Sequence, residues 1–77
     1  MTADQAAARQ AARENLQREL LRELEVAHLI IRNALNLMDV DMKWRWGEQN
    51  SKDGVDGDGI TRALEREALI ARVKATS

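Results

Sequence analysis

Residues 20–38, LLRELEVAHLIIRNALNLM, decide the fold of this chain. The stretch has neither glycine nor proline, and its apolar side chains recur after alternating steps of four and three residues. This spacing is typical of a helix that packs against a second helix along one seam. We predict that the seam is the interface of a homodimer and that it consists of Leu20, Leu24, Ala27, Ile31, Ala34 and Met38.

The same helix is expected to begin close to the N-terminus. Thr2 and Gln5 have the spacing of a capping box, in which each side chain accepts a hydrogen bond from the other residue's backbone N–H. A helix over about 3–38 would be on the order of 54 Å long, at about 1.5 Å per residue. Its alanine-rich start either permits close helix approach in the dimer or is an exposed, frayed end.

The helix is apolar over most of its circumference. Beside the predicted seam stand Val26, Leu29, Ile30, Leu35 and Leu37. The remaining polar stripe consists of Glu25, His28, Arg32 and Asn36, and we expect His28 to be solvated or to lie at the rim of the dimer. One 77-residue chain has too little material to cover such a helix, so we predict a helical bundle formed by two chains.

Composition narrows the possible classes of protein. The chain lacks cysteine and proline and is rich in good helix formers, which predicts one all-α domain over residues 1–77. Twelve basic and thirteen acidic residues are interspersed, so nucleic acid is not an expected partner. No apolar run approaches the roughly 18 residues of a membrane span, and the start does not resemble a signal peptide. We therefore expect a cytoplasmic protein without a membrane partner.

Two shorter helices are predicted after the long one, over about 40–49 and 59–75. Asp39 or Asp41 would cap the first, and Gly47 would weaken it. Trp44 and Trp46 are about 200° apart on a helix, so they cannot face the same core. Either one ring closes the core while the other is exposed beside Lys43 and Arg45 as a binding hot spot, or both rings are buried against the long helices of a dimer.

Residues 50–58 and the start of the last helix partly match a calcium-binding loop. Asp56, Asp58 and Glu65 take the third, fifth and twelfth positions of that pattern, but its first ligand falls on Gly54. The competing interpretation is a glycine-rich hinge in which Asp58 caps a helix that begins near Gly59 or Ile60. We predict the hinge, and no metal or cofactor.

Catalysis has few candidate residues, because the chain has one histidine and neither cysteine nor tyrosine. We predict a non-enzymatic protein without catalytic residues. A small helical DNA-binding regulator is the alternative, with Arg62, Arg66 and Arg72 on phosphates, although Glu65 and Glu67 stand among them. The favoured prediction is a protein that binds another protein. The residues predicted to bind this partner are Trp44, Arg45, Trp46, Arg62 and Arg66.

At AHLIIRNALNLM, KWRWGEQN and DGVDGDGITRALEREALIARV, the chain resembles small proteins encoded by temperate bacteriophages and prophages of proteobacteria. The resemblance covers roughly residues 20–74, and its motifs carry no chemistry that transfers to single residues. One kind in this class is a short helical dimer of Mu-like phages that blocks a host quorum-sensing transcription activator and a pilus assembly ATPase. The resemblance thus implies a host-takeover protein that inhibits a host regulator or motor in the bacterial cytoplasm.

Overall fold

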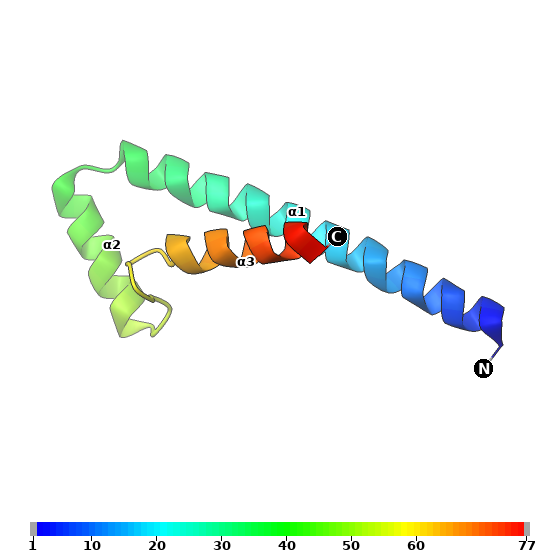
Figure 1. Ribbon diagram of the computed structural model, residues 1–77. Coiled ribbons are helices and arrows are strands. Elements are labelled where there is room, and N and C mark those ends of the chain that lie inside the picture. The colour runs from blue at the N-terminus through cyan, green and yellow to red at the C-terminus, as the bar shows by residue number, and fades with distance from the viewer. Residues whose placement is uncertain (1, 77) are drawn as a thin grey trace.

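The computed structural model describes residues 2–76, and this part of the chain is all-helical. Its helices are α1 (Ala3–Leu37), α2 (Val40–Lys52) and α3 (Ala63–Thr76). α1 runs along the whole molecule, α2 turns away at its end, and α3 returns antiparallel along the C-terminal half of α1 (Figure 1). The predicted all-α fold, with one long and two shorter helices, is confirmed. Of the helices within residues 2–76, none has both the length and the apolarity needed to cross a membrane.

Local interactions define the ends of α1. The Gln5 backbone N–H donates to Thr2 Oγ1 at 3.2 Å, and the Thr2 N–H donates to Gln5 Oε1 at 3.0 Å, which confirms the predicted capping box. The helix ends at Leu37, one residue before the predicted end, because Met38 has extended backbone angles. The Met38 N–H donates to the Leu35 carbonyl at 3.3 Å.

α2 begins where predicted and ends later. The Asp39 carboxylate accepts from the Met42 N–H at 2.8 Å and caps the helix. α2 then continues to Lys52, past the predicted end at residue 49, because the stop signal is Gly54 and not Gly47. Gly54 has a φ of 68°, in the left-handed region that glycine adopts without steric cost.

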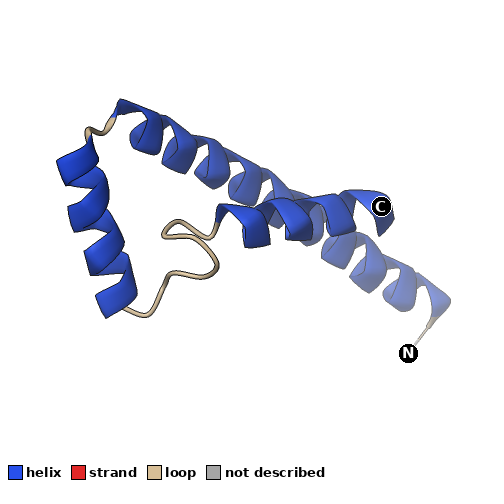
Figure 2. Ribbon diagram, turned by 60° about the vertical axis from the view of Figure 1, so that its left-hand side comes forward, coloured by secondary structure: helices blue, strands red, loops and turns tan. Residues whose placement is uncertain are grey.

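The end of α2 has the hydrogen bonds of a Schellman motif. The Gly54 N–H donates to the Ser51 carbonyl at 3.1 Å, and the Val55 N–H donates to the Asn50 carbonyl at 3.0 Å. Asn50 also holds the far end of the following loop, because its Nδ2 donates to the Ile60 carbonyl at 2.8 Å. In both views of the ribbon, the loop returns from the end of α2 toward the start of α3 (Figures 1 and 2).

α3 begins at Ala63, later than predicted, and Asp58 therefore does not cap it. The chain enters α3 through Arg62, whose φ of 56° is unusual for a residue other than glycine. The Arg62 carbonyl accepts from the Arg66 N–H at 3.1 Å and starts the helical hydrogen bonds. Residues 60–61 form a turn where the first helical turn was predicted.

α3 packs along one face of α1. Half-buried residues there recur after steps of three and four, and we call them the inner row: Leu21, Leu24, His28, Ile31, Leu35 and Met38. From α3, the half-buried residues are Ala63, Glu65, Arg66, Ile70 and Val73. Within residues 2–76, Gly47 is the only residue that is fully buried. One chain by itself therefore forms a thin apolar layer instead of a core.

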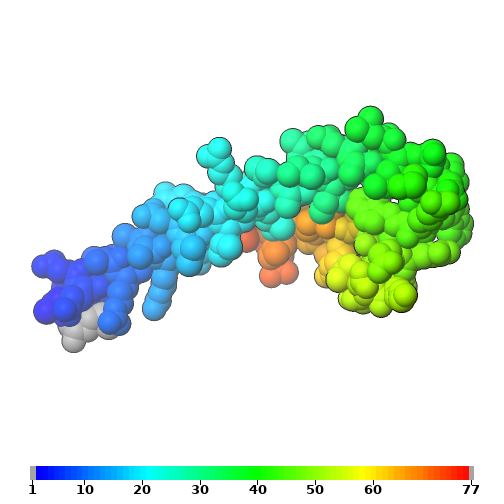
Figure 3. All heavy atoms as spheres, turned by 180° about the vertical axis from the view of Figure 1, so that it is seen from behind, coloured from blue at the N-terminus to red at the C-terminus, as the bar shows by residue number. Residues whose placement is uncertain are grey.

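A second row of α1 lies beside the inner row on the helix surface. It precedes the inner row by one residue at each step, which turns it about 100° around the helix. We call it the outer row: Leu16, Leu20, Glu23, Ala27, Ile30, Ala34 and Leu37. All of its members are exposed except Ala34, which is half-buried. Further toward the N-terminus, residues 3–13 project beyond the C-terminal end of α3 as a narrow arm (Figure 3).

Candidate partner-binding surface

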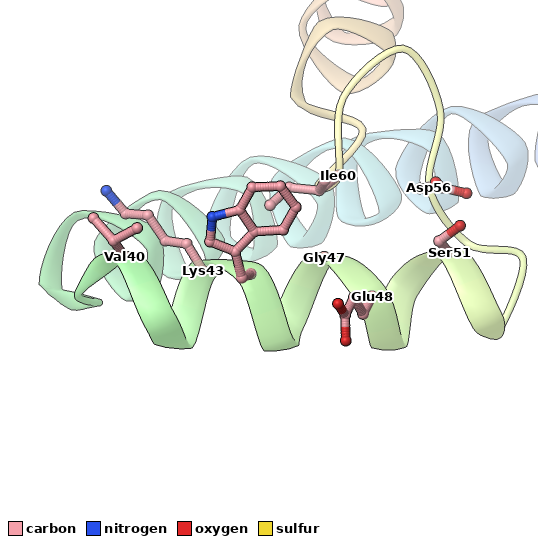
Figure 4. Close-up of a pocket in the computed structure, with 8 residues that line it drawn as sticks. Val40, Lys43, Gly47, Glu48, Ser51, Asp56 and Ile60 are labelled. Atoms are coloured by element: carbon pink, nitrogen blue, oxygen red, sulfur yellow. The ribbon is translucent and has the colours of Figure 1, made fainter.

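A groove lies along α2 where the loop folds onto the helix. Its volume is about 540 Å³. Ile60 lies over α2 close to Gly47, with Val40 and Lys43 toward one end of the groove and Asp56 toward the other (Figure 4). The complete lining is Val40, Lys43, Trp44, Gly47, Glu48, Ser51, Asp56 and Ile60. Apolar walls with charged groups at the rim are typical of a surface that accepts an apolar side chain.

Helical spacing explains how α2 forms this groove. Val40, Trp44, Gly47 and Ser51 follow each other at intervals of four, three and four residues, so they share one face of the helix. Gly47 leaves the middle of that face without a side chain, and Ile60 occupies the space: a Cβ at Gly47 would lie 3.1 Å from Ile60 Cγ2. The glycine expected to weaken α2 is thus the position on which the loop docks.

Trp44 and Trp46 point to different environments. Trp44 is 69% exposed, and Val40, one helical turn earlier, is 70% exposed. Trp46 is half-buried and lines an inner hollow together with Ile31 of α1 and Ile60 of the loop. The separation expected from their spacing is therefore present in the chain: one ring contributes to its apolar layer, and the other is open to solvent.

Among the predicted partner-binding residues, only Arg45 lies exposed beside Trp44. Arg45 Nη2 is 3.1 Å from the Asp41 carboxylate, in an exposed pair one helical turn apart. Such a pair contributes little to stability. Trp44 and Arg45 are thus neighbouring exposed residues on α2, and Trp46 faces inward.

Arg62 and Arg66 are held by the chain itself. Arg62 Nη1 donates to the Asp56 carbonyl at 3.2 Å and lies 3.5 Å from the Glu65 carboxylate. Arg66 Nη1 donates to the Thr61 carbonyl. The two side chains therefore stabilise the loop and the start of α3.

His28 does not lie at a solvated edge, which corrects the expectation from its polar neighbours. Its side chain is 12% exposed, in the inner row between α1 and α3. Arg66 Nε donates to His28 Nδ1 at 3.1 Å, so the imidazole proton is on Nε2, 3.4 Å from the Glu67 carboxylate. With both nitrogens engaged, the imidazole joins the two helices.

Glu65, in the first turn of α3, binds the acidic loop through its carboxylate. Glu65 Oε2 accepts from the Asp58 N–H at 3.3 Å, and its side chain lies where a Cβ on Gly57 would be. A side chain at Gly57 would therefore displace the Glu65 carboxylate, although the φ of Gly57 is not positive. In the part of the chain that the structure describes, no three histidine, aspartate or glutamate residues gather in a way that could hold a metal ion.

The residues predicted as a dimer interface are divided between the two rows of α1. Leu24, Ile31 and Met38 belong to the inner row and are half-buried within the chain. Leu20, Ala27 and Ala34 belong to the outer row, where the first two are exposed. The predicted seam alternates between two parallel rows, because both are apolar enough to continue its pattern.

Sequence reasoning did not identify Val40, Gly47 and Ile60 as residues that line the groove. The spacing of Val40, Trp44 and Gly47 on α2 could have indicated the first two. Ile60 comes from a loop, and no periodic pattern indicates its position.

No protein family model matches the chain, and neither does any curated protein or solved structure. The resemblance to phage-encoded proteins therefore stays a prediction.

Proposed function

We propose that this chain is a small helical homodimer that binds a host protein through the groove beside Trp44 and inhibits it without catalysis. The observation that carries the proposal is the exposed pair Trp44 and Val40 over an apolar groove on a regular helix. Exposing a tryptophan costs solvation free energy unless a partner covers it, and tryptophan is enriched among residues that dominate binding energy.

The groove also indicates the chemistry of the partner. Val40, Trp44 and Ile60 would receive one or two large apolar side chains, such as those along one face of an amphipathic helix. Lys43 at one rim and Asp56 at another would pair with charges of either sign beside them. In keeping with the phage resemblance, we propose a transcription regulator or a motor ATPase in the bacterial cytoplasm as the partner class.

Other roles find less support on this surface. The imidazole of His28 is occupied by Arg66 and Glu67, which disfavours a role as general base. Arg62 and Arg66, which a DNA-binding regulator would place on phosphates, bind the chain's own loop. A homodimer is supported by how little one chain buries alone.

The test begins with affinity capture from host lysate, using the unmodified chain and two variants. Trp44→Ala removes the proposed anchor, whereas Leu64→Ala removes a similarly exposed apolar side chain on α3 as the matched control. A protein retained by the unmodified chain and by Leu64→Ala but lost by Trp44→Ala supports the proposal. Equal retention by both variants would show that the groove is not the binding surface.

Fluorescence then tests direct contact with the purified partner. The chain has only two tryptophans, so Trp46→Phe leaves Trp44 as the single indole fluorophore. Burial of the Trp44 ring should shift its emission to shorter wavelength, and Trp44→Ala should weaken affinity more than about 30-fold, given the usual cost of at least 2 kcal/mol for a hot spot. Binding without a change in Trp44 emission would contradict the proposed contact.

A further inference from the structure

We infer that the outer row of α1 is the seam of an antiparallel homodimer in which Leu16 of one chain lies opposite Leu37 of the other. The inference rests on the homodimer of the proposed function, and it assigns the face and the direction of that dimer. It depends on α1 and not on the Trp44 groove, so the two can fail separately.

The spacing of the outer row is that of a helix-to-helix seam. From Leu16 to Leu37 its members follow at alternating steps of four and three residues, as in a left-handed coiled coil. Leu16, Ile30 and Leu37 are largely exposed in the single chain. Leu69 of α3 shares a hollow with Leu20, so the apolar surface extends from the outer row onto α3. A surface of this kind favours a second α1 as its cover.

The exposed area of the chain supports burial on this scale. The chain exposes 6409 Å², whereas a compact monomer of its mass exposes roughly 4,700 Å². The excess is roughly 1,700 Å² per chain. Obligate homodimers bury roughly 1,000–2,500 Å² on each partner. A second copy of this chain would therefore remove about as much surface as the single chain has in excess.

Charge decides against a parallel arrangement. In a parallel pair, each seam residue faces its own copy, so Glu23 would meet Glu23 of the other chain. Continued toward the N-terminus with the same steps, the row passes through Arg13 and Arg9, which would also face their own copies. Three layers of like charge along one seam oppose this pairing.

The antiparallel arrangement removes these clashes and matches large residues with small ones. With Ala27 close to the two-fold axis, Leu16 lies opposite Leu37, and Leu20 lies opposite Ala34. Glu23 then lies near Ile30 and away from its own copy. A leucine opposite an alanine fills the seam better than two facing alanines, which would leave a gap.

The same register places the N-terminal arm of each chain beside the other chain. Residues 3–13 of one chain would continue past the corner between α1 and α2 of the other chain. That corner carries Asp39 and Asp41, and the arm carries Arg9 and Arg13. Opposite charges therefore meet where the two arms cross the two corners, which also favours the antiparallel direction.

Single cysteines test the face and the direction, because the natural chain has none. A disulfide needs Cα atoms within about 7 Å of each other. In the antiparallel dimer the two copies of Ala27 are adjacent, whereas the two copies of Leu16 are about 30 Å apart, at about 1.5 Å per residue along the helix. Leu29→Cys is the matched control, since Leu29 is close to Ala27 along α1 but points away from the outer row.

Under mild oxidation, with circular dichroism confirming the helices of each variant, Ala27→Cys should form a linked dimer and Leu29→Cys should not. Leu16→Cys and Leu37→Cys should each stay unlinked alone and should link when the two variants are mixed. Leu16→Cys linked to itself would establish a parallel dimer and overturn the inference. Linkage of Leu29→Cys equal to that of Ala27→Cys, or a mass near 8.7 kDa in sedimentation, would overturn it as well.

Failure of the proposed function would give a different result. In that case no protein would be captured in a Trp44-dependent way, but the cysteine pattern would still form. If the cysteine variants do not link as expected while capture still depends on Trp44, the groove is the binding surface but the outer row is not the dimer seam.

Discussion

Replacing Ile30 with aspartate should dissociate the proposed dimer while leaving each chain helical. Ile30 lies in the middle of the outer row and is 62% exposed in the single chain. Its side chain lies outside the inner row that packs on α3, so the substitution should disturb the α1–α3 packing little. The effect should therefore appear in association and not in secondary structure.

The expected magnitude follows from the exposed fraction. Full burial of an isoleucine side chain contributes about 1.5–3 kcal/mol, and the dimer would bury the remaining 62% on each chain. Two copies of Ile30 thus contribute about 2–4 kcal/mol to association. Their loss weakens the dissociation constant roughly 30- to 1,000-fold, at 1.4 kcal/mol per factor of ten. This range is a lower bound, because the aspartate must also lose hydration in the seam.

Sedimentation equilibrium over a dilution series measures this constant, with circular dichroism as the check on folding. Leu29→Asp is the control, because it introduces the same charge at the adjacent exposed position of α1, outside both rows. The control should keep the dissociation constant of the unmodified chain to within a few-fold. If Ile30→Asp stays dimeric at the same concentrations, or if Leu29→Asp dissociates equally, the outer row is not the seam.

Three further predictions concern the loop and the helix ends. Gly57→Ala should lower the free energy of unfolding by about 0.5–1.5 kcal/mol in a urea melt, because its methyl group displaces the Glu65 carboxylate from its hydrogen bond. Gly59→Ala is the control: its methyl group meets no atom within 4 Å, so its free energy of unfolding should be almost unchanged. An equal loss in both variants would contradict the role of that carboxylate. Gly47→Val should lower the free energy of unfolding by about 1–3 kcal/mol and lower the melting temperature, since the added side chain pushes the loop off α2. An unchanged melting temperature would show that the loop does not need this contact. Thr2→Ala should cost about 0.5–2 kcal/mol of local helix stability, which faster hydrogen exchange of first-turn amides would detect while the global melt stays unchanged.

Features that depend on near neighbours could be predicted from the sequence. The capping box of Thr2 and Gln5 and the cap of Asp39 each join residues three positions apart. The side chain and the backbone N–H that it caps are brought together by the first turn of the helix alone. The same holds for the direction of Trp44 and Trp46, which follows from the angle between neighbouring helical positions.

The face of α1 that packs within the chain could not be predicted in the same way. Inner and outer rows differ by one residue, and both are largely apolar between Leu20 and Met38. A pattern of four and three steps can therefore alternate between the two rows. Only the position of α3 separates the rows, and that position depends on how the loop folds.

The loop itself escaped prediction because its contacts are distant in sequence or unusual in backbone geometry. Arg62 adopts a positive φ that its residue type does not indicate, and this delays the start of α3. Arg66 contacts His28 across 38 positions of the chain. Both arginines look like surface charges in the sequence, and only the folded chain shows that they hold its segments together.

The hydrogen bond from Asn50 to the Ile60 carbonyl also has a consequence for the order of folding. It closes a loop of ten positions, whereas the bond between His28 and Arg66 closes one of 38. The longer closure costs about 1 kcal/mol more in chain entropy. We therefore expect α2 and its loop to form first, as a local nucleus onto which α3 and α1 later close. Substitutions at Asn50 should then slow folding, whereas substitutions at His28 should mainly speed unfolding.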